Sequence, residues 1–358
     1  RCFDDEEYAN LDIPLVDDIS DCDVLFGVKE VVTSDLLEGK TYFYFSHTIK
    51  EQSYNRTLLQ TMIAKGISMV DYECLTHANG RRILGFGRYA GVVGCYNGFL
   101  AYGKRTNRYS LKAAHQCYNR LDLDKELQKV NLPAVKIIVS GNGRVGQGAL
   151  EIIMQLNIRE VSKEEFVSQS FDEAVYVHLD FYDYNERIDG STFSNKDFFS
   201  NPECFQSCFM NYACCADIFI AGHYYGKDSP YLFTREDAKS SDFKIRTIAD
   251  ISCDIDGPVA STIRASTILK PIYGYNPHTE SEDVFDKDDV ITVMAVDNLP
   301  CELPKDASED FGNALLQHVI PCLLAEDSDQ IITRATICEN GDLTTNYEYL
   351  REYINTKD

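Results

Sequence analysis

The fold is decided by the stretch Lys136-Ile-Ile-Val-Ser-Gly-Asn-Gly-Arg-Val-Gly146. Its first five residues are mostly apolar and β-branched, which predicts a buried strand. A G-x-G-x-x-G pattern follows and leads into an apolar helix at residues 148–156. Such glycines allow a tight turn and let the backbone approach a pyrophosphate, while the helix N-terminus supplies free N–H donors. We therefore expect a dinucleotide at Gly141, Gly143, Arg144, Val145 and Gly146.

Strand and helix patterns alternate on both sides of this motif. Strands are expected at residues 23–29, 41–47, 68–73, 136–140, 158–161, 174–179, 217–221, 246–251 and 290–296. Helices are expected at residues 52–65, 90–102, 202–212 and 307–324, with a polar helical pattern at 106–133. Strand–helix–strand order favours parallel pairing. The predicted fold class is α/β, with two Rossmann-like domains, parallel sheets flanked by helices and an active-site cleft between the domains.

The length of 358 residues also favours two domains, because it exceeds what one hydrophobic core normally serves. The segment ahead of the glycine motif and the C-terminal segment are expected to form one discontinuous substrate domain. Its predicted bounds are residues 1–100 and 298–358, and the dinucleotide-binding domain takes residues 101–297. Residues 180–209 have little periodicity and are interpreted as an insertion.

Charge and cysteine content restrict the partners. The formal net charge of −23 repels nucleic acids and anionic membranes, so neither is an expected partner. The 13 cysteines are an odd number without a small-domain framework, which is typical of reduced thiols in a cytoplasmic protein. The cluster at Cys204, Cys208, Cys214 and Cys215 has no standard zinc spacing, so no metal site is expected.

Cofactor choice is expected to depend on the strand that follows the glycine motif in the chain. An acid at the end of that strand would hold the ribose 2′-OH of NAD. Ser162 and Lys163 offer a hydroxyl and a cation there instead, which favours the 2′-phosphate of NADP. Glu164 or Glu165 can still take the role of the acid if the register shifts by two, so NAD and NADP both stay open.

A lysine and a histidine follow two successive strands of the first domain. Lys29 ends one strand and His47 ends the next. Ligands of open parallel sheets bind at the carboxyl ends of strands, so both side chains are expected at the same crevice. Lysine and histidine together suit general acid–base catalysis, because burial and like charge bring a lysine pKa down toward that of histidine.

Candidate substrate-binding groups lie nearby in the sequence. Arg81 and Arg82 flank a glycine-rich turn, and arginine binds carboxylates through two parallel hydrogen bonds. Glu73 follows the third strand and is suited to accept a hydrogen bond from a substrate ammonium. Residues Asp297, Asn298 and Leu299 follow the last strand, again at a carboxyl end.

Taken together, these motifs resemble the saccharopine dehydrogenase (lysine-forming) family, closest to its lysine-ketoglutarate reductase type. That family is related to the alanine dehydrogenase/transhydrogenase superfamily. The resemblance covers nearly the whole chain. It is carried by Gly27-Val-Lys-Glu30, Phe45-Ser-His-Thr-Ile-Lys50, Asp71-Tyr-Glu73, Gly80-Arg-Arg-Ile-Leu-Gly-Phe-Gly87, Ala249-Asp-Ile-Ser-Cys-Asp254 and Val296-Asp-Asn-Leu-Pro300.

The resemblance implies an NAD(P)-dependent oxidoreductase that interconverts saccharopine with lysine and 2-oxoglutarate. It implies that Lys29 and His47 are the catalytic pair, and that Glu73 and Arg82 lie at the substrate. It places residues 297–299 at the nicotinamide end of the cofactor. The family begins with a further strand–helix–strand that carries a substrate-binding arginine, and this sequence is expected to start after it.

Two other functions are compatible with these residues. One is an amino-acid dehydrogenase similar to alanine dehydrogenase, a two-domain enzyme that also uses a lysine and a histidine at these strand ends. The other is a non-catalytic NAD(P)-binding homologue that has kept the fold. The sequence leaves the oligomeric state open.

Overall fold

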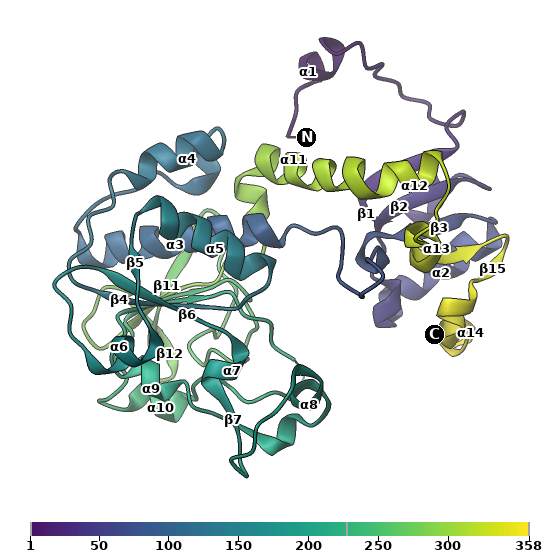
Figure 1. The fold of residues 1–358 in the computed structure, drawn as a ribbon. Coiled ribbons are helices and arrows are strands. Elements are labelled where there is room, and N and C mark those ends of the chain that lie inside the picture. The colour runs from purple at the N-terminus through teal and green to yellow at the C-terminus, as the bar shows by residue number, and fades with distance from the viewer. Residues whose placement is uncertain (1, 227, 357–358) are drawn as a thin grey trace. The chain divides into compact units, whose positions relative to one another are not determined.

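Two compact units make up the protein in the computed structural model, which describes residues 2–226 and 228–356. Unit 1 comprises Arg1–Gly85 and Ser308–Asp358, and unit 2 comprises Phe86–Ala307 (Figure 1). The boundary expected after residue 100 falls inside α3 (Gly87–Thr106). That helix belongs to unit 2 over its whole length, because its glycine-lined face packs against α5 (Arg144–Gln155).

Unit 2 is built on an eight-stranded sheet in the order β12-β11-β13-β10-β9-β4-β6-β5. The strands are β4 (Lys136–Ser140), β5 (Arg159–Glu160), β6 (Val175–Leu179), β9 (Ile218–Ala221), β10 (Thr247–Asp250), β11 (Ile272–Asn276), β12 (Ser281–Asp283) and β13 (Ile291–Met294). The six strands from β13 to β5 are parallel, which confirms the predicted α/β class. The hairpin of β11 and β12 pairs antiparallel to β13 and was not predicted.

Helices cover both faces of this sheet (Figure 1). Ile137 and Val139 of β4 face a core shared with α3 and α5. Ile138 faces the second core, which includes residues of α6 (Lys163–Ser168), α9 (Met210–Ala213) and α10 (Arg235–Lys239). Burial on both faces explains why these strands are continuous apolar runs rather than alternating ones. The polar segment at 106–133 forms only η4 (Ala114–Gln116) and α4 (Arg120–Leu127).

The insertion of unit 2 is a small substructure of its own. It contains α7 (Phe181–Tyr184), β7 (Asn185–Arg187), α8 (Asn195–Ser200), η5 (Pro202–Cys204) and β8 (Phe205–Ser207). The single helix predicted at residues 202–212 is wrong, because β8 pairs antiparallel with β7 and α9 begins only at Met210. Phe193, Phe198 and Phe205 pack on one another and hold the insertion together.

Unit 1 is built on a five-stranded sheet in the order β1-β2-β3-β14-β15. β1 (Val24–Lys29), β2 (Thr41–Phe45) and β3 (Ser68–Asp71) are parallel as predicted, and α2 (Ser53–Ala64) joins β2 to β3. β14 (Thr336–Glu339) pairs antiparallel to β3, and β15 (Asp342–Leu343) pairs antiparallel to β14. The unit is therefore assembled from two distant segments of the chain.

Further helices complete unit 1. They are α1 (Asp5–Ala9), η1 (Thr33–Asp35), η2 (Thr48–Lys50), η3 (Tyr72–Cys74), α13 (Ile331–Ala335), η8 (Thr345–Leu350) and α14 (Arg351–Asn355). The expected closing helix runs from α11 (Pro304–Ala314) through a π-helical turn (Leu315–Val319) into α12 (Ile320–Leu324). Its Phe311 packs against Phe45 and Tyr72 of unit 1.

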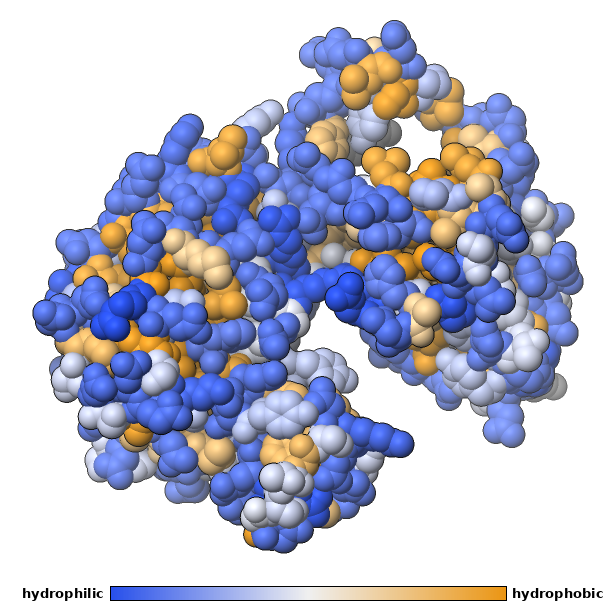
Figure 2. Space-filling model, in the orientation of Figure 1, coloured by the Kyte–Doolittle hydropathy of each residue, from blue (hydrophilic) through white to orange (hydrophobic). Residues whose placement is uncertain are grey.

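The surface is mainly hydrophilic on the face that Figure 2 shows, as the net charge of −23 predicts. Across residues 2–226 and 228–356, every helix is too short or too polar to cross a membrane.

Candidate cofactor and catalytic sites

The three glycines of the turn after β4 have different environments. A Cβ on Gly141 would come within 2.3 Å of the Gly222 carbonyl oxygen, and a Cβ on Gly146 within 1.8 Å of the Gly141 carbonyl oxygen. Gly141 also has φ +96°, which favours glycine. A Cβ on Gly143 would meet no heavy atom within 4 Å. The first and third glycines are thus required by packing, while the second leaves its side of the turn open to a ligand.

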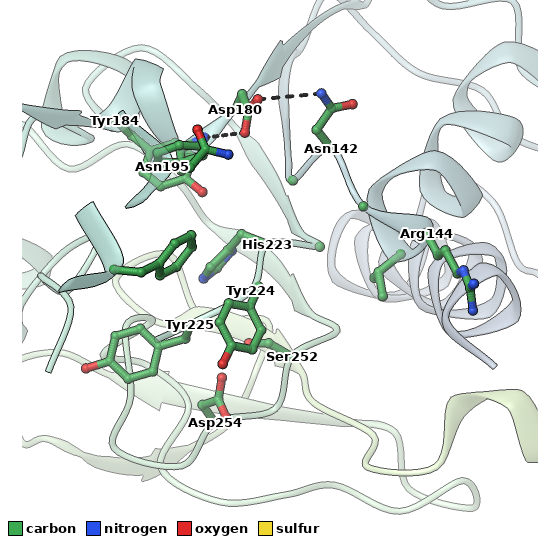
Figure 3. A pocket seen from close by; sticks show the side chains of 16 residues that line it. Asn142, Arg144, Asp180, Tyr184, Asn195, His223, Tyr224, Tyr225, Ser252 and Asp254 are labelled. Atoms are coloured by element: carbon green, nitrogen blue, oxygen red, sulfur yellow. Dashed lines mark hydrogen bonds between the residues drawn. The ribbon is translucent and has the colours of Figure 1, made fainter. Parts of the chain in front are cut away.

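A cavity of about 570 Å³ lies beside this turn, at the carboxyl ends of β4, β6, β9 and β10 (Figure 3). Of the predicted cofactor residues, Gly141, Gly143, Arg144 and Val145 line it, and Gly146 packs behind the turn. The insertion contributes Phe181, Tyr184, Asn195 and Phe199 to the opposite wall. The open Gly143, the first turn of α5 and the apolar wall fit a dinucleotide.

Asp180, rather than a residue near Ser162, is the acid that follows the strand next to β4. The strand that pairs with β4 is β6, which comes second along the chain after α5, whereas β5 lies at the edge of the sheet. Asp180 directly follows β6, lines the cavity and accepts a hydrogen bond from the Asn142 side chain at 3.5 Å (Figure 3). The prediction of Ser162 assumed that chain order and sheet order agree, whereas β5, which precedes Ser162, lies at the sheet edge and Ser162 is not among the cavity-lining residues.

Ser162 and Lys163 have structural partners instead. The Ser162 hydroxyl accepts a hydrogen bond from the Glu165 backbone as the N-cap of α6. Lys163 forms an ion pair with Asp183. The cation on which the NADP interpretation rested is therefore already paired with a carboxylate, and neither residue lines the cavity.

His223 is a second cavity residue that sequence reasoning missed. It follows β9, and its Nδ1 lies 3.0 Å from the Ser140 hydroxyl. Burial lowers the pKa of His223 to about 4, so the ring is neutral at physiological pH. Its Nε2 is buried and has no hydrogen-bond partner within the part of the chain that the structure describes. The advance signal was its position two residues after a strand end.

The loop after β10 is fixed by a fully buried carboxylate. Asp250 accepts hydrogen bonds from the Ser252 hydroxyl at 2.7 Å and the Thr262 hydroxyl at 2.6 Å. This arrangement brings Ser252 and Asp254 to the cavity wall, where burial raises the pKa of Asp254. The motif at residues 249–254 had been noted for its resemblance without a site role.

The predicted residues after β13 lie outside the cavity lining. Asp297 and Asn298 are exposed, and Asn298 precedes η6 (Leu299–Glu302). Leu299 is 1% exposed and packs in the core near Gly94 of α3. Its side chain is therefore a packing group of unit 2.

In unit 1, the structure brings Lys29 and His47 to the same edge of the sheet. Lys29 is paired in register with Phe45, two residues before His47, and its side chain is exposed. The His47 ring stacks on Phe45, and its Nδ1 lies 4.0 Å from Glu30 Oε2. His47 has φ +56°, an uncommon backbone conformation for a residue other than glycine.

Of the predicted substrate residues, Glu73 and Arg82 contact each other, whereas Arg81 is not part of this cluster. Arg82 donates hydrogen bonds to the Glu73 carboxylate at 2.5 Å and to its carbonyl oxygen at 3.2 Å. Lys50 Nζ lies 3.7 Å from the same carboxylate. Glu73 Oε2 is buried and has no hydrogen-bond partner among the described residues. Arg81 is exposed, and its backbone makes two hydrogen bonds: its N–H donates to the Asn79 side chain and its carbonyl oxygen accepts from the His77 N–H.

The chain is similar in sequence to known proteins over most of its length. The family described as alanine dehydrogenase/PNT, N-terminal domain, matches residues 1–93. Alpha-aminoadipic semialdehyde synthase of Mus musculus is 28% identical over 98% of this chain, which spans 43% of that protein. Saccharopine dehydrogenase [NAD(+), L-lysine-forming] of Schizosaccharomyces pombe is 28% identical over 91% of this chain and 82% of its own length. These proteins are homologues of the chain.

Solved structures agree at the level of the fold. An L-alanine dehydrogenase superposes with a TM-score of 0.60, covering 98% of this chain and 88% of that one at 14% identity. A transhydrogenase from Sinorhizobium meliloti superposes with a TM-score of 0.53 at 15% identity. The names of the homologous saccharopine dehydrogenases support an oxidoreductase of the amino-acid dehydrogenase kind with a nicotinamide cofactor. The chain spans less than half the length of the mouse synthase.

Proposed function

We propose that the chain catalyses the reversible reaction of saccharopine, NAD⁺ and water to L-lysine, 2-oxoglutarate, NADH and a proton. The single observation that carries the proposal is the register of β1 and β2, which puts Lys29 and His47 at one sheet edge beside the Glu73–Arg82 cluster. The likeness to saccharopine dehydrogenases and semialdehyde synthases over more than nine-tenths of the chain supports the substrate class.

Lys29 and His47 are the acid–base pair of the proposed reaction. In the oxidative direction, one of them takes the proton from the secondary amine nitrogen as hydride leaves the neighbouring carbon. The pair then removes a proton from the water that adds to the imine carbon. It returns a proton to the lysine nitrogen when the carbon–nitrogen bond breaks. A nicotinamide ring supplies the hydride acceptor.

Glu73 and the arginines bind the substrate in this proposal. The buried Glu73 Oε2 has an open acceptor position for a substrate ammonium. Arg82, held beside Glu73, and the exposed Arg81 supply forks for the substrate carboxylates. Asp297 and Asn298, exposed after β13, are proposed for the nicotinamide end, with Leu299 supporting them from the core.

The cofactor that we propose is NAD(H) rather than NADP(H). Asp180 lies at the end of the strand next to β4, where a carboxylate accepts a hydrogen bond from the ribose 2′-OH. The same negative charge repels a 2′-phosphate. The name of the Schizosaccharomyces pombe homologue includes NAD(+), which agrees with this choice for that protein.

The proposal is tested by following NADH absorbance with lysine and 2-oxoglutarate in the wild-type chain, Lys29→Met and His47→Gln. We expect turnover that needs both substrates and a decrease of about 10²- to 10⁴-fold in each variant. Lys125→Met and His278→Gln, at exposed positions of unit 2, serve as matched controls and should keep wild-type rates. Equal rates in Lys29→Met and Lys125→Met would refute the catalytic role.

A second candidate function is favoured by the family match at residues 1–93 and by the alanine dehydrogenase superposition. It is the reductive amination of pyruvate by ammonia. Turnover with pyruvate and ammonia but without lysine would select it. NADH binding with no turnover in either assay would identify a non-catalytic homologue instead.

A further inference from the structure

A fully buried carboxylate lies beneath the proposed catalytic edge of unit 1. Asp71 ends β3 and is 0% exposed. Its Oδ2 accepts hydrogen bonds from the Ser46 hydroxyl and from the Ser46 backbone N–H, the latter at 3.0 Å. Its Oδ1 accepts from the Glu73 backbone N–H at 2.7 Å. Each carboxylate oxygen thus holds a different segment of the chain.

The first of these segments carries His47. Ser46 and Thr48, on either side of it, are both fully buried, and their hydroxyls are hydrogen-bonded to each other at 2.8 Å. The Thr48 backbone N–H also donates to the Ser46 hydroxyl at 3.2 Å. His47 between them has φ +56° and a side chain that is 25% exposed. A left-handed residue other than glycine persists only where its surroundings fix it, and the Ser46 anchor does so.

The second segment carries Glu73. Asp71 is the N-cap of η3, and its bond to the Glu73 N–H fixes the start of this turn. Glu73 in turn accepts the hydrogen bond from Arg82. One buried side chain therefore determines the backbone position of both the proposed acid–base histidine and the proposed ammonium acceptor.

We propose that Asp71 is a positioning residue that aligns His47 and Glu73 for the reaction. This inference rests on the proposed function, which gives His47 and Glu73 their roles in the reaction. Only a carboxylate serves here, because donors approach both of its oxygens. An amide at this position would turn an NH₂ group toward one of the N–H donors and release either His47 or Glu73. Burial raises the pKa of Asp71, as expected for a carboxylate kept out of water.

The test compares Asp71→Asn and Ser46→Ala with the control Asp217→Asn. The control removes a partly buried carboxylate that directly precedes β9 in unit 2. We expect Asp71→Asn to lower kcat by about 100-fold, the effect of a small misplacement of reacting groups, while the Kd for NADH is unchanged. Ser46→Ala should lower kcat in the same direction. Asp217→Asn should keep wild-type kcat.

Combination with His47→Gln separates positioning from a general structural role. If Asp71 acts partly through His47, adding Asp71→Asn to His47→Gln should lower kcat far less than it does alone. A full multiplicative loss in the double variant, or losses that follow only the fraction of folded protein, would overturn the proposal. Ser46→Ala in the His47→Gln background gives the same comparison if Asp71→Asn fails to fold.

An NMR measurement keeps this inference apart from the proposed function. The ring signals of His47, assigned with His47→Gln, should move in Asp71→Asn and Ser46→Ala and stay in place in Asp217→Asn. This shift needs no turnover. A wild-type chain that is inactive with lysine and 2-oxoglutarate would therefore refute the proposed function alone. Unmoved His47 signals would refute the positioning role.

Discussion

We propose that a single carboxylate charge, that of Asp180, distinguishes NAD from NADP in this chain. Asp180 lies at the cavity wall beside the glycine turn, while the nearby cation Lys163 is already paired with Asp183. Asp180 therefore supplies a negative charge at the proposed ribose position. A 2′-hydroxyl can donate a hydrogen bond to it, and a 2′-phosphate is repelled.

We predict that the wild-type chain binds NADH more tightly than NADPH, and that Asp180→Ser decreases this preference by about tenfold or more. The ratio of the two Kd values, measured by cofactor fluorescence, checks this. Asp172→Ser makes the same charge change at an exposed position away from the cavity and should leave the ratio unaltered. A wild-type preference for NADPH would contradict the assignment.

Residues that act through neighbours in sequence were predictable, and those that act through distant partners were not. The roles of Gly141 and Gly143 follow from their spacing alone. Asp180 was missed because the pairing of β6 with β4 skips one strand of the chain. Asp71 was missed because its partner Ser46 is 25 residues away. Asp180 directly followed a predicted strand and Asp71 lay within one, but nothing local marked either acid as buried or cavity-lining.

At the level of elements, two glycines determine how closely α3 and α5 approach. A Cβ on Gly91 would lie 1.9 Å from the Val145 carbonyl oxygen, and one on Gly148 would lie 2.0 Å from the Arg88 carbonyl oxygen. Both obstacles are backbone atoms, so neither helix can yield by a side-chain rotation. The crossing also places the start of α5, and with it the glycine turn, at the cavity.

We predict that Gly91→Ala lowers the free energy of unfolding of unit 2 by about 2 kcal/mol or more through overpacking. Gly312→Ala is the matched control, because its added methyl in α11 meets no atom within 4 Å. It should raise stability by up to about 1 kcal/mol. Urea unfolding of both variants makes the comparison. Equal urea midpoints for Gly91→Ala and Gly312→Ala would show that α3 and α5 move apart easily to accept the added methyl group.

An ion-pair network joins three helices of unit 2. Glu151 of α5 accepts hydrogen bonds from Arg88 of α3 at 2.6 Å and from Arg120 of α4 at 3.0 Å. Burial opposes ionisation of Glu151, but the two arginines outweigh it and lower its pKa below the ordinary value of 4.5. The stabilisation is therefore present above pH 4.5 and is lost as the pH falls through the lowered pKa.

We predict that Glu151→Gln lowers stability by about 1 kcal/mol at neutral pH, a figure discounted for the partial exposure of the pairs. The difference from wild type should shrink as the pH falls below 4.5. Thermal unfolding across this range measures it. Glu173→Gln breaks an exposed pair with Arg159 and should have little effect at any pH. A difference that grows toward acid pH would have the wrong sign for this mechanism.

Elements with a long apolar run were predictable, and short antiparallel additions were not. The strands β4, β6, β9, β10 and β13 lie where their apolar runs predicted them. The strands β7, β8, β14 and β15 have two to four residues each, too few to establish a period of two. Pairing, rather than local pattern, determines these strands: β14 adds to the edge of β3, and β7 and β8 pair with each other.

At the scale of the whole molecule, the proposed cofactor residues and the proposed acid–base residues belong to different units. We predict that NADH at 100 times its Kd stabilises the binding-competent unit by about 2.7 kcal/mol. Hydrogen exchange should show this as slower exchange in β4, α5 and β6, with β1 to β3 unchanged. Lys29→Met should show the same protection. Slower exchange confined to β1 to β3 would show that NADH binds unit 1, and would contradict the proposed cofactor site in unit 2.

Because β14 pairs with β3 but comes much later in the chain, the edge of β3 stays unpaired during part of protein synthesis. A ribosome synthesises β1 to β3 first, then all of unit 2, and only afterwards the strand that covers the free edge of β3. Unit 2 is continuous and can fold as soon as it emerges. The nascent first unit waits with β3 uncovered through that whole interval, and such an edge pairs readily with other chains. Newly made chains should therefore depend on chaperones more than the finished protein does.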